Sequence, residues 1–129
     1  MFASAKEAIV TDEKRIVWER YVAAWKESSM DGKLAALRES VEPNCTYRDP
    51  LMVADGHVQL VDYMLNFHQQ IPGGHFVTTY FLAHHDRSIA KWNMLDGAGN
   101  ITGDGATFGE YNERGLLVAM TGFFETSPQ

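Results

Sequence analysis

The 129-residue sequence has one cysteine, four prolines and no long apolar run. A single cysteine, Cys45, excludes a disulfide within the chain, which fits a reducing compartment. No stretch approaches the ~18 apolar residues that a membrane-spanning helix needs. Residues 1–10 also lack the apolar core of a signal peptide, because Lys6 and Glu7 interrupt them. We therefore expect a cytoplasmic protein without a membrane partner.

Basic residues are also few: 11 Lys and Arg stand against 17 Asp and Glu, and the formal net charge is −6. Phosphate binding requires clustered Lys and Arg, so the composition argues against nucleic acid as the main partner. The five histidines show no HxH or HxxxH spacing, and the glycines lack the spacing of a phosphate-binding or dinucleotide-binding loop. These patterns predict neither a metal site nor an organic cofactor.

What the sequence does contain is helical periodicity in its first half and strand-like runs in its second half. This segregation predicts one α+β domain rather than alternating βαβ units. Helices are expected at about 12–29, 33–41 and 57–70, and strands at about 45–49, 75–85, 87–95, 101–111 and 116–126. Turn-rich links at 96–100 and 112–115 predict antiparallel hairpins, and residues 1–11 are expected to form an N-terminal extension.

The last expected strand is apolar on both faces. Leu116 and Met120 share one face, and Leu117 and Phe123 share the other. A strand of this kind should be covered on both sides. The three helices can cover one side, and we expect a second copy of the chain to cover the other, which predicts a homodimer through the outer sheet face.

The order of the elements, the motif Tyr47-Arg48-Asp49-Pro50 and the segments 103–115 and 120–124 resemble the nuclear transport factor 2-like superfamily. The resemblance is to the branch of SnoaL-like polyketide cyclases and ketosteroid isomerases, and it extends over about residues 12–126. It implies a single SnoaL-like domain over residues 1–129. Its fold would be a cone-shaped, curved antiparallel or mixed β-sheet with three helices packed on the concave face.

The resemblance also implies functional residues. Tyr21 matches the oxyanion donor of the isomerases, Asp49 their general base, and Asp104 their second, protonated oxyanion donor. Met64 falls where the isomerases have a supporting tyrosine, with Tyr63 one position away, a departure that weakens the expected network around Tyr21. The residues expected to contact a ligand are Trp25, Met64, Trp92, Phe108, Met120 and Phe124.

The chemistry of two aspartates and a tyrosine in one pocket can be argued from the residues alone, without the family resemblance. An aspartate in an apolar pocket has a raised pKa and can act as a base, or as a neutral hydrogen-bond donor. Two aspartates and a tyrosine facing one pocket suit proton transfer beside a carbonyl group, with no cofactor. Each residue also has an ordinary structural alternative: Asp49 as a strand-end turn, Tyr21 as a core residue and Asp104 as a surface carboxylate.

The leading prediction is a small-molecule enzyme of the ketosteroid isomerase or polyketide cyclase type acting on a hydrophobic carbonyl compound such as a steroid, polyketide or terpenoid. The alternatives are a non-catalytic binder of an apolar ligand and a protein-interaction module using the outer sheet face. Epoxide hydrolysis by an Asp-Arg-Asp arrangement is disfavoured, because Arg48 and Asp49 should point to opposite faces of a strand. The same alternation should separate His84 from His85 unless a bulge intervenes.

Overall fold

The computed structural model describes residues 5–126, which form three helices and six strands. In chain order these are α1 (Ala5–Lys26), α2 (Met30–Arg38), β1 (Val41–Asp49), β2 (Met52–Asp55), α3 (Gly56–Gln70), β3 (His75–His84), β4 (Arg87–Leu95), β5 (Ile101–Tyr111) and β6 (Leu117–Phe123). The three predicted helices and the four predicted long strands are confirmed, with boundaries that shift most at the start of α1 and around β1.

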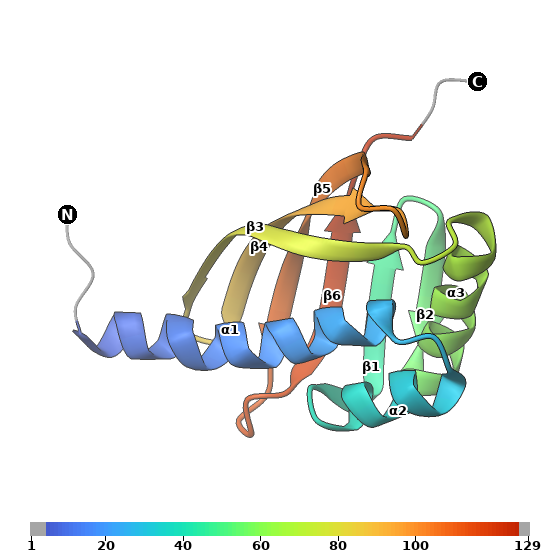
Figure 1. The fold of residues 1–129 in the computed structure, drawn as a ribbon. Coiled ribbons are helices and arrows are strands. Elements are labelled where there is room, and N and C mark those ends of the chain that lie inside the picture. The colour runs from blue at the N-terminus through green and yellow to red at the C-terminus, as the bar shows by residue number, and fades with distance from the viewer. Residues whose placement is uncertain (1–4, 127–129) are drawn as a thin grey trace.

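The six strands form one mixed sheet in the order β2-β1-β6-β5-β4-β3. All neighbouring strands are antiparallel except β1 and β6, which are parallel. The sheet does not close, so β2 and β3 are its edges. Helix α1 crosses in front of the curved strands, while α2 and α3 lie at the β1–β2 end (Figure 1). One face of the sheet is thus covered by helices, and no helix of residues 5–126 covers the other.

The first helix begins earlier than its sequence signals predict. The predicted start is at about residue 12, just after Thr11, a residue type that often caps helices, but α1 starts at Ala5, so Thr11 lies inside the helix. Its hydroxyl donates to the Ala83 carbonyl on β3 (3.0 Å). The polar side chain that resembles a cap therefore joins the helix to the sheet, and residues 5–11 of the expected extension form the first turns of α1.

The strand β2 is the element that the sequence did not reveal. Pro50 ends β1 as expected, but the chain reverses within two residues, and Asp49 pairs with Met52 across an antiparallel hairpin. The Asp49 carboxylate stabilises this reversal by accepting a hydrogen bond from the Leu51 backbone N–H (2.8 Å). Four residues are too few to show a strand periodicity, which is why β2 escaped prediction.

One hydrophobic core lies between the sheet and the helices. Its buried members are Trp18, Tyr21, Val22, Ala24, Trp25, Leu37, Val41, Cys45, Tyr47, Ala54, Leu60, Val61, Met64, Phe81, Ala83, Ala90, Tyr111, Leu117 and Met120. The α1 members recur every three or four residues, the spacing of one helix face. The core therefore fixes α1 against the sheet along that face.

Lys33, on α2, is a fully buried cation that reaches the end of α1. Its ammonium group donates to the carbonyl oxygens of Ala24 (3.0 Å) and Trp25 (3.2 Å). Carbonyls in the last helical turn lack partners within the helix, and a cation there also interacts favourably with the helix dipole. Burial lowers the pKa of Lys33 to about 8, an effect that Glu27 partly opposes. Lys33 thus fixes the helix end that carries Trp25.

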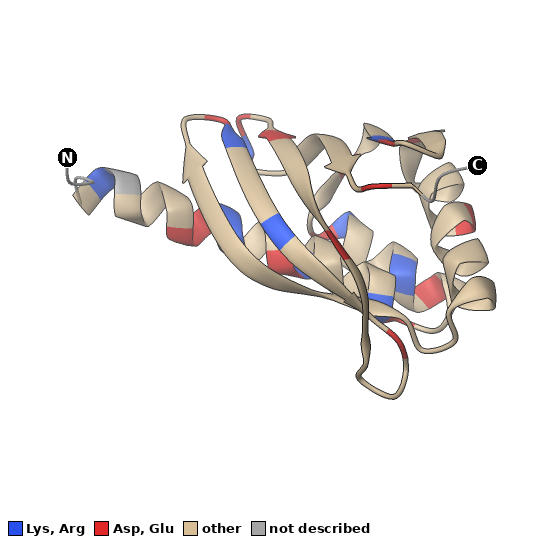
Figure 2. Ribbon diagram, turned by 90° about the horizontal axis from the view of Figure 1, so that it is seen from above, with Lys and Arg blue, Asp and Glu red and all other residues tan. Residues whose placement is uncertain are grey.

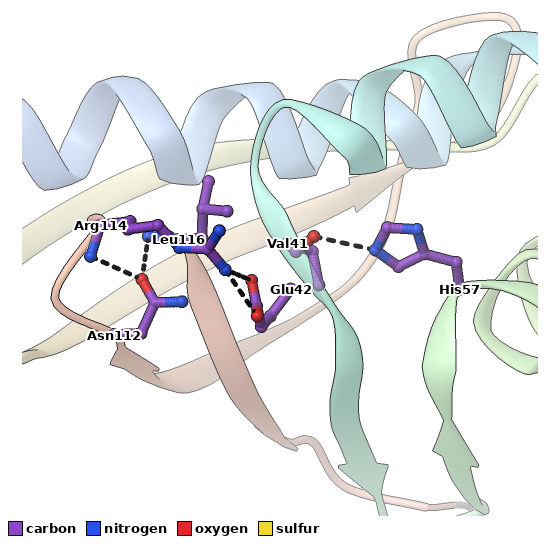
Figure 3. A network of polar contacts seen from close by, with 6 residues as sticks. All are labelled: Val41, Glu42, His57, Asn112, Arg114 and Leu116. Atoms are coloured by element: carbon purple, nitrogen blue, oxygen red, sulfur yellow. Dashed lines mark hydrogen bonds and ion pairs between the residues drawn. The ribbon is translucent and has the colours of Figure 1, made fainter.

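A polar network joins the start of β1 to its neighbours, at the end of the strand away from Asp49 (Figure 3). Arg114 in the β5–β6 turn donates to both carboxylate oxygens of Glu42 (2.7 and 2.6 Å), and Asn112 accepts from the Arg114 backbone N–H (3.0 Å). The His57 ring, at the start of α3, donates to the Val41 carbonyl (2.8 Å). These contacts fix the end of the sheet where β1 begins, whereas the cavity lies at the end where β1 finishes with Asp49.

Candidate functional site

A cavity of about 1420 Å³ lies between the sheet, α1 and α3. Its apolar walls are aromatic, formed by Trp25, Phe67, Phe76, Trp92 and Phe124. Phe76 meets Trp92 edge-to-face at 5.0 Å between ring centroids, and it meets Trp25 in the same way at 5.3 Å. Such tilted contacts are favourable arrangements of aromatic rings. The walls therefore suit a flat, apolar ligand.

Asp49 lines this cavity and is held by three hydrogen bonds. The hydroxyls of Tyr47 (2.6 Å) and Tyr63 (2.7 Å) both donate to Oδ2, and the Leu51 backbone N–H donates to Oδ1. A carboxylate oxygen has two lone pairs. Both lone pairs of Oδ2 are thus occupied, whereas Oδ1 keeps one that no described protein donor uses.

The two tyrosines reach Asp49 from different elements. Tyr47 lies two residues before Asp49 on β1, so both side chains are on the same face of the strand. Tyr63 comes from the side of α3 that faces the cavity. Burial raises the pKa of both tyrosines, and the nearby Asp49 carboxylate raises the pKa of each further. Both hydroxyls therefore remain protonated donors throughout the neutral range.

Tyr21, on α1, also lines the cavity and is almost fully buried. Burial raises the pKa of Tyr21, the Trp25 indole N–H opposes that rise, and Asp49 and Tyr63 are close enough to add to it. Unlike the hydroxyls of Tyr47 and Tyr63, the Tyr21 hydroxyl donates to no acceptor within residues 5–126. It is a protonated hydroxyl in the same cavity as Asp49, with a hydrogen bond to offer.

Of the three residues expected to be catalytic, the structure places Tyr21 and Asp49 together and Asp104 apart from them. Asp104 contributes to the rim of the cavity, but its side chain is exposed. It pairs with Asn93 across β4 and β5, and therefore lies on the sheet face opposite that of Trp92. The expected role of Asp104 required an apolar surrounding, and this position does not provide one.

Three of the expected ligand contacts line the cavity and three do not. Those that line it are Trp25, Trp92 and Phe124. Met64 and Met120 are fully buried in the core, and Phe108 lies on the outer sheet face, where the Arg87 guanidinium is 5.8 Å from its ring centroid. On α3 it is Tyr63 rather than Met64 that reaches the cavity, because consecutive helix residues point about 100° apart.

His84 and His85 lie outside the cavity, at the β3–β4 turn. His84 ends β3, and His85 adopts a left-handed φ of 51°, so their Nδ1 atoms meet at 3.1 Å. The expected separation fails because His85 is a turn residue and not a strand residue. Across the part of the chain that the structure describes, no group of three or more His, Cys, Asp or Glu side chains could hold a metal ion.

A curved mixed sheet with three helices on one face is the fold that this chain shares with solved nuclear transport factor 2-like proteins. Residues 18–124 match the SnoaL-like domain family, and the chain belongs to that family. No helix of residues 5–126 is long and apolar enough to cross a bilayer.

Three solved structures illustrate the similarity. A proposed isomerase of the SnoaL-like family from Agrobacterium tumefaciens has a TM-score of 0.81 at 22% identity, over 89% of this chain and 99% of that one. A proposed SnoaL-like polyketide cyclase from a Jannaschia species has a TM-score of 0.75 at 13% identity, over 97% and 91%. A proposed ketosteroid isomerase from Kribbella flavida has a TM-score of 0.64 at 18% identity, over 92% and 82%. These identities establish the fold alone, and no curated protein matches the sequence.

Proposed function

We propose that this protein is a cofactor-independent acid–base enzyme of the isomerase or cyclase type that acts on a hydrophobic carbonyl compound. The observation that carries the proposal is the Asp49 carboxylate, held at an aromatic cavity by Tyr47 and Tyr63, with Tyr21 lining the same cavity. Membership of the SnoaL-like family, whose structural neighbours include a proposed isomerase and a proposed cyclase, supports this class of reaction.

The proposed reaction begins with a proton transfer to Asp49. The unoccupied lone pair of Oδ1 accepts a proton from the carbon next to the substrate carbonyl, and the electron pair of the broken C–H bond forms an enolate. Tyr21 donates a hydrogen bond to the enolate oxygen as negative charge develops there. Asp49 then returns the proton to another carbon of the enolate, which completes an isomerisation. Tyr47 and Tyr63 keep Oδ2 fixed throughout.

The test is isomerisation of a β,γ-unsaturated ketosteroid, together with binding of a planar phenolic steroid mimic. Asp49→Asn should lose turnover and still bind the mimic, because the amide keeps the shape of the side chain but cannot accept the proton. Asp31→Asn, an exposed carboxylate of α2, is the matched control and should keep full activity. Turnover that survives Asp49→Asn would overturn the proposal.

A non-catalytic ligand-binding protein is the second candidate. It is favoured by the same three hydrogen bonds, because they satisfy much of the Asp49 carboxylate before any substrate arrives. A site of this kind would bind the phenolic mimic without turning over any carbonyl compound. The paired binding and turnover measurements therefore separate the two candidates.

We also propose that a second copy of the chain covers the outer sheet face. Four large apolar side chains on this face are exposed by 48% (Tyr80), 50% (Leu82), 42% (Ile89) and 61% (Phe123). Charged residues are sparse along the strands and gather on the helices and at strand ends (Figure 2). Sedimentation equilibrium should show a dimer that Ile89→Lys converts to monomer. A wild-type protein that stays monomeric at high concentration would contradict this proposal.

A further inference from the structure

Two histidine side chains meet at the β3–β4 turn, at the end of the sheet opposite the cavity. The strand β4 begins just after this turn and leads to Met94, which lines the cavity (Figure 1). The Nδ1 atoms of His84 and His85 are 3.1 Å apart, and both side chains are exposed to solvent. Their ring planes are almost perpendicular, at 87°. The proposed acid–base chemistry at Asp49 does not involve this pair.

The backbone of the turn brings the two rings together. His85 and Asp86 form a two-residue hairpin loop, and His84 pairs with Arg87 across it. His85 has a φ of 51° and is the one non-glycine residue with a left-handed φ within residues 5–126. Glycine is the usual residue at such a hairpin position, because it has no Cβ. A histidine there is strained, and the strained backbone turns its ring towards His84 instead of to the other face of the strand.

The distance between the two nitrogens fits a chelated metal ion. Imidazole nitrogens bind transition metals at about 2.0–2.1 Å, so two nitrogens 3.1 Å apart would enclose an angle of about 95–100° at the metal. This angle is close to the right angle between neighbouring ligands of a tetragonal Cu²⁺ or Ni²⁺ ion, and it is smaller than the tetrahedral angle of about 109°. The pair thus offers two neighbouring coordination positions, and the exposure of both rings leaves the remaining positions to solvent.

Metal binding would replace the hydrogen bond that the two rings share. In that bond one Nδ1 carries a proton and donates it to the lone pair of the other Nδ1. Because both rings are exposed, this proton can move to the Nε2 atom of the same ring, where water accepts its hydrogen bond. Both Nδ1 lone pairs are then free to bind a metal, and both rings stay neutral.

The charges next to the pair favour a cation. The guanidinium of Arg87 is already paired with two carboxylates, since its Nε is 3.6 Å from Asp86 and its Nη1 is 3.2 Å from Glu110. Two carboxylates and one guanidinium together carry one negative charge in excess. A metal ion bound by the two rings would therefore lie beside a region of net negative charge and not beside an unpaired arginine.

We propose that His84 and His85 form a metal site that holds a late divalent transition-metal ion, Cu²⁺ most tightly, through their two Nδ1 atoms. Imidazole is a good ligand for such ions, and affinity at nitrogen sites rises along the series to Cu²⁺ and falls again at Zn²⁺. Mg²⁺ and Ca²⁺ prefer oxygen ligands and should not bind there. The site lies outside the cavity and does not rest on the proposed function, so Asp49→Asn should bind Cu²⁺ as tightly as the wild type.

Titration with Cu²⁺ in a non-coordinating buffer tests the site. Calorimetry measures the affinity, and pulsed electron paramagnetic resonance counts the imidazole rings bound to the metal. The wild-type protein should bind one Cu²⁺ through two imidazoles. His84→Gln and His85→Asn should each lower the affinity about tenfold or more and leave one imidazole, because the second ring acts at a high effective concentration. Asparagine tolerates a left-handed φ, so His85→Asn should keep the turn.

His75→Gln is the matched control. The Nδ1 atom of His75 lies 3.1 Å from the Gly73 carbonyl oxygen, so this ring uses its nitrogen on the backbone and not on a second imidazole. The variant should keep the wild-type affinity and both bound imidazoles. Parallel titrations with Zn²⁺ and Mg²⁺ should show weaker binding of the first and no binding of the second.

Several outcomes would overturn the proposal. They are a wild-type protein that does not bind Cu²⁺, a spectrum with a single imidazole, an affinity that survives both His84→Gln and His85→Asn, and an equal loss in His75→Gln. Zn²⁺ bound more tightly than Cu²⁺ would overturn the choice of metal. Circular dichroism spectra of the variants check that a lost site is not a lost fold.

Discussion

Removing the Tyr47 hydroxyl should destabilise the protein more than removing the Tyr63 hydroxyl, although both donate to the same oxygen of Asp49. The Tyr47 side chain is buried, so when its 2.6 Å bond is lost Oδ2 keeps one donor, and water reaches the vacated hydroxyl position less easily than it does at Tyr63. Hydrogen bonds to charged groups contribute about 1.5–3 kcal/mol, so Tyr47→Phe should lower the free energy of unfolding by about 2 kcal/mol. Tyr63 is half-buried, and water can replace its hydroxyl, so Tyr63→Phe should cost about 1 kcal/mol or less.

Urea unfolding at neutral pH measures both values, and a double-mutant cycle isolates the contact. Tyr47→Phe, Asp49→Asn and the double variant should give a coupling energy of about 1 kcal/mol or more, because the two groups touch directly. Strictly additive effects would refute the bond between Tyr47 and the carboxylate. Equal costs for the two tyrosines would refute the argument from burial, since it assigns the difference to access of water.

Three further outcomes follow from other parts of the fold. The pKa of Lys33 is about 8 in the folded protein against an ordinary 10.5, so between these values the unfolded chain binds more protons. The free energy of unfolding of the wild type should therefore rise between pH 7 and 10 by on the order of 1–2 kcal/mol more than that of Lys33→Met, as measured by urea unfolding. The same change in both proteins would contradict the buried ammonium group. A Cβ at Gly105 would lie 2.6 Å from the Trp92 ring and from a backbone carbonyl oxygen, which is closer than these atoms can pack. Gly105→Ala should therefore lower the free energy of unfolding by about 1–3 kcal/mol and weaken binding of the phenolic mimic. Gly103→Ala is its control, because that Cβ meets only a flexible methionine end at 3.3 Å, and equal losses in the two variants would refute the steric argument. Arg114→Ala should lower the free energy of unfolding by no more than about 1 kcal/mol, despite the two short hydrogen bonds to Glu42, because the guanidinium is largely exposed. A larger loss would show that the network in Figure 3 stabilises the fold.

The long strands and α3 could be predicted because their signals are local. Each hairpin combines a period of two with a turn-rich link, and α3 ends at Gln70, just before the helix-breaking segment Pro72-Gly73-Gly74. The start of α1 and the strand β2 carried no such signal. Thr11 resembles a cap in sequence, but its hydroxyl bonds to the Ala83 carbonyl on β3, a partner that no local pattern can reveal.

The candidate site was predictable only where its geometry is also local. Tyr47 and Asp49 share a strand face by their spacing of two, a signal present in the sequence. The choice between Tyr63 and Met64 is different, because the two residues are one position apart and an alignment uncertain by one residue cannot separate them. On a helix that single step turns a side chain by about 100°, which is the difference between the cavity and the core.

The position of Asp104 changes which groups can stabilise negative charge in the cavity. Asp104 is exposed on the opposite sheet face, outside the apolar surrounding that a buried donor to an enolate would need. The hydroxyls at the Asp49 end of the cavity come from tyrosines, and of these Tyr47 and Tyr63 are already bonded to Asp49. In the proposed reaction, stabilisation of the enolate would therefore depend on Tyr21, whose hydroxyl has no acceptor of its own within residues 5–126. The same arrangement makes the Asp49 carboxylate asymmetric: tyrosine hydroxyls occupy both lone pairs of Oδ2, whereas Oδ1 accepts only from the Leu51 N–H and keeps one lone pair for the proposed proton transfer.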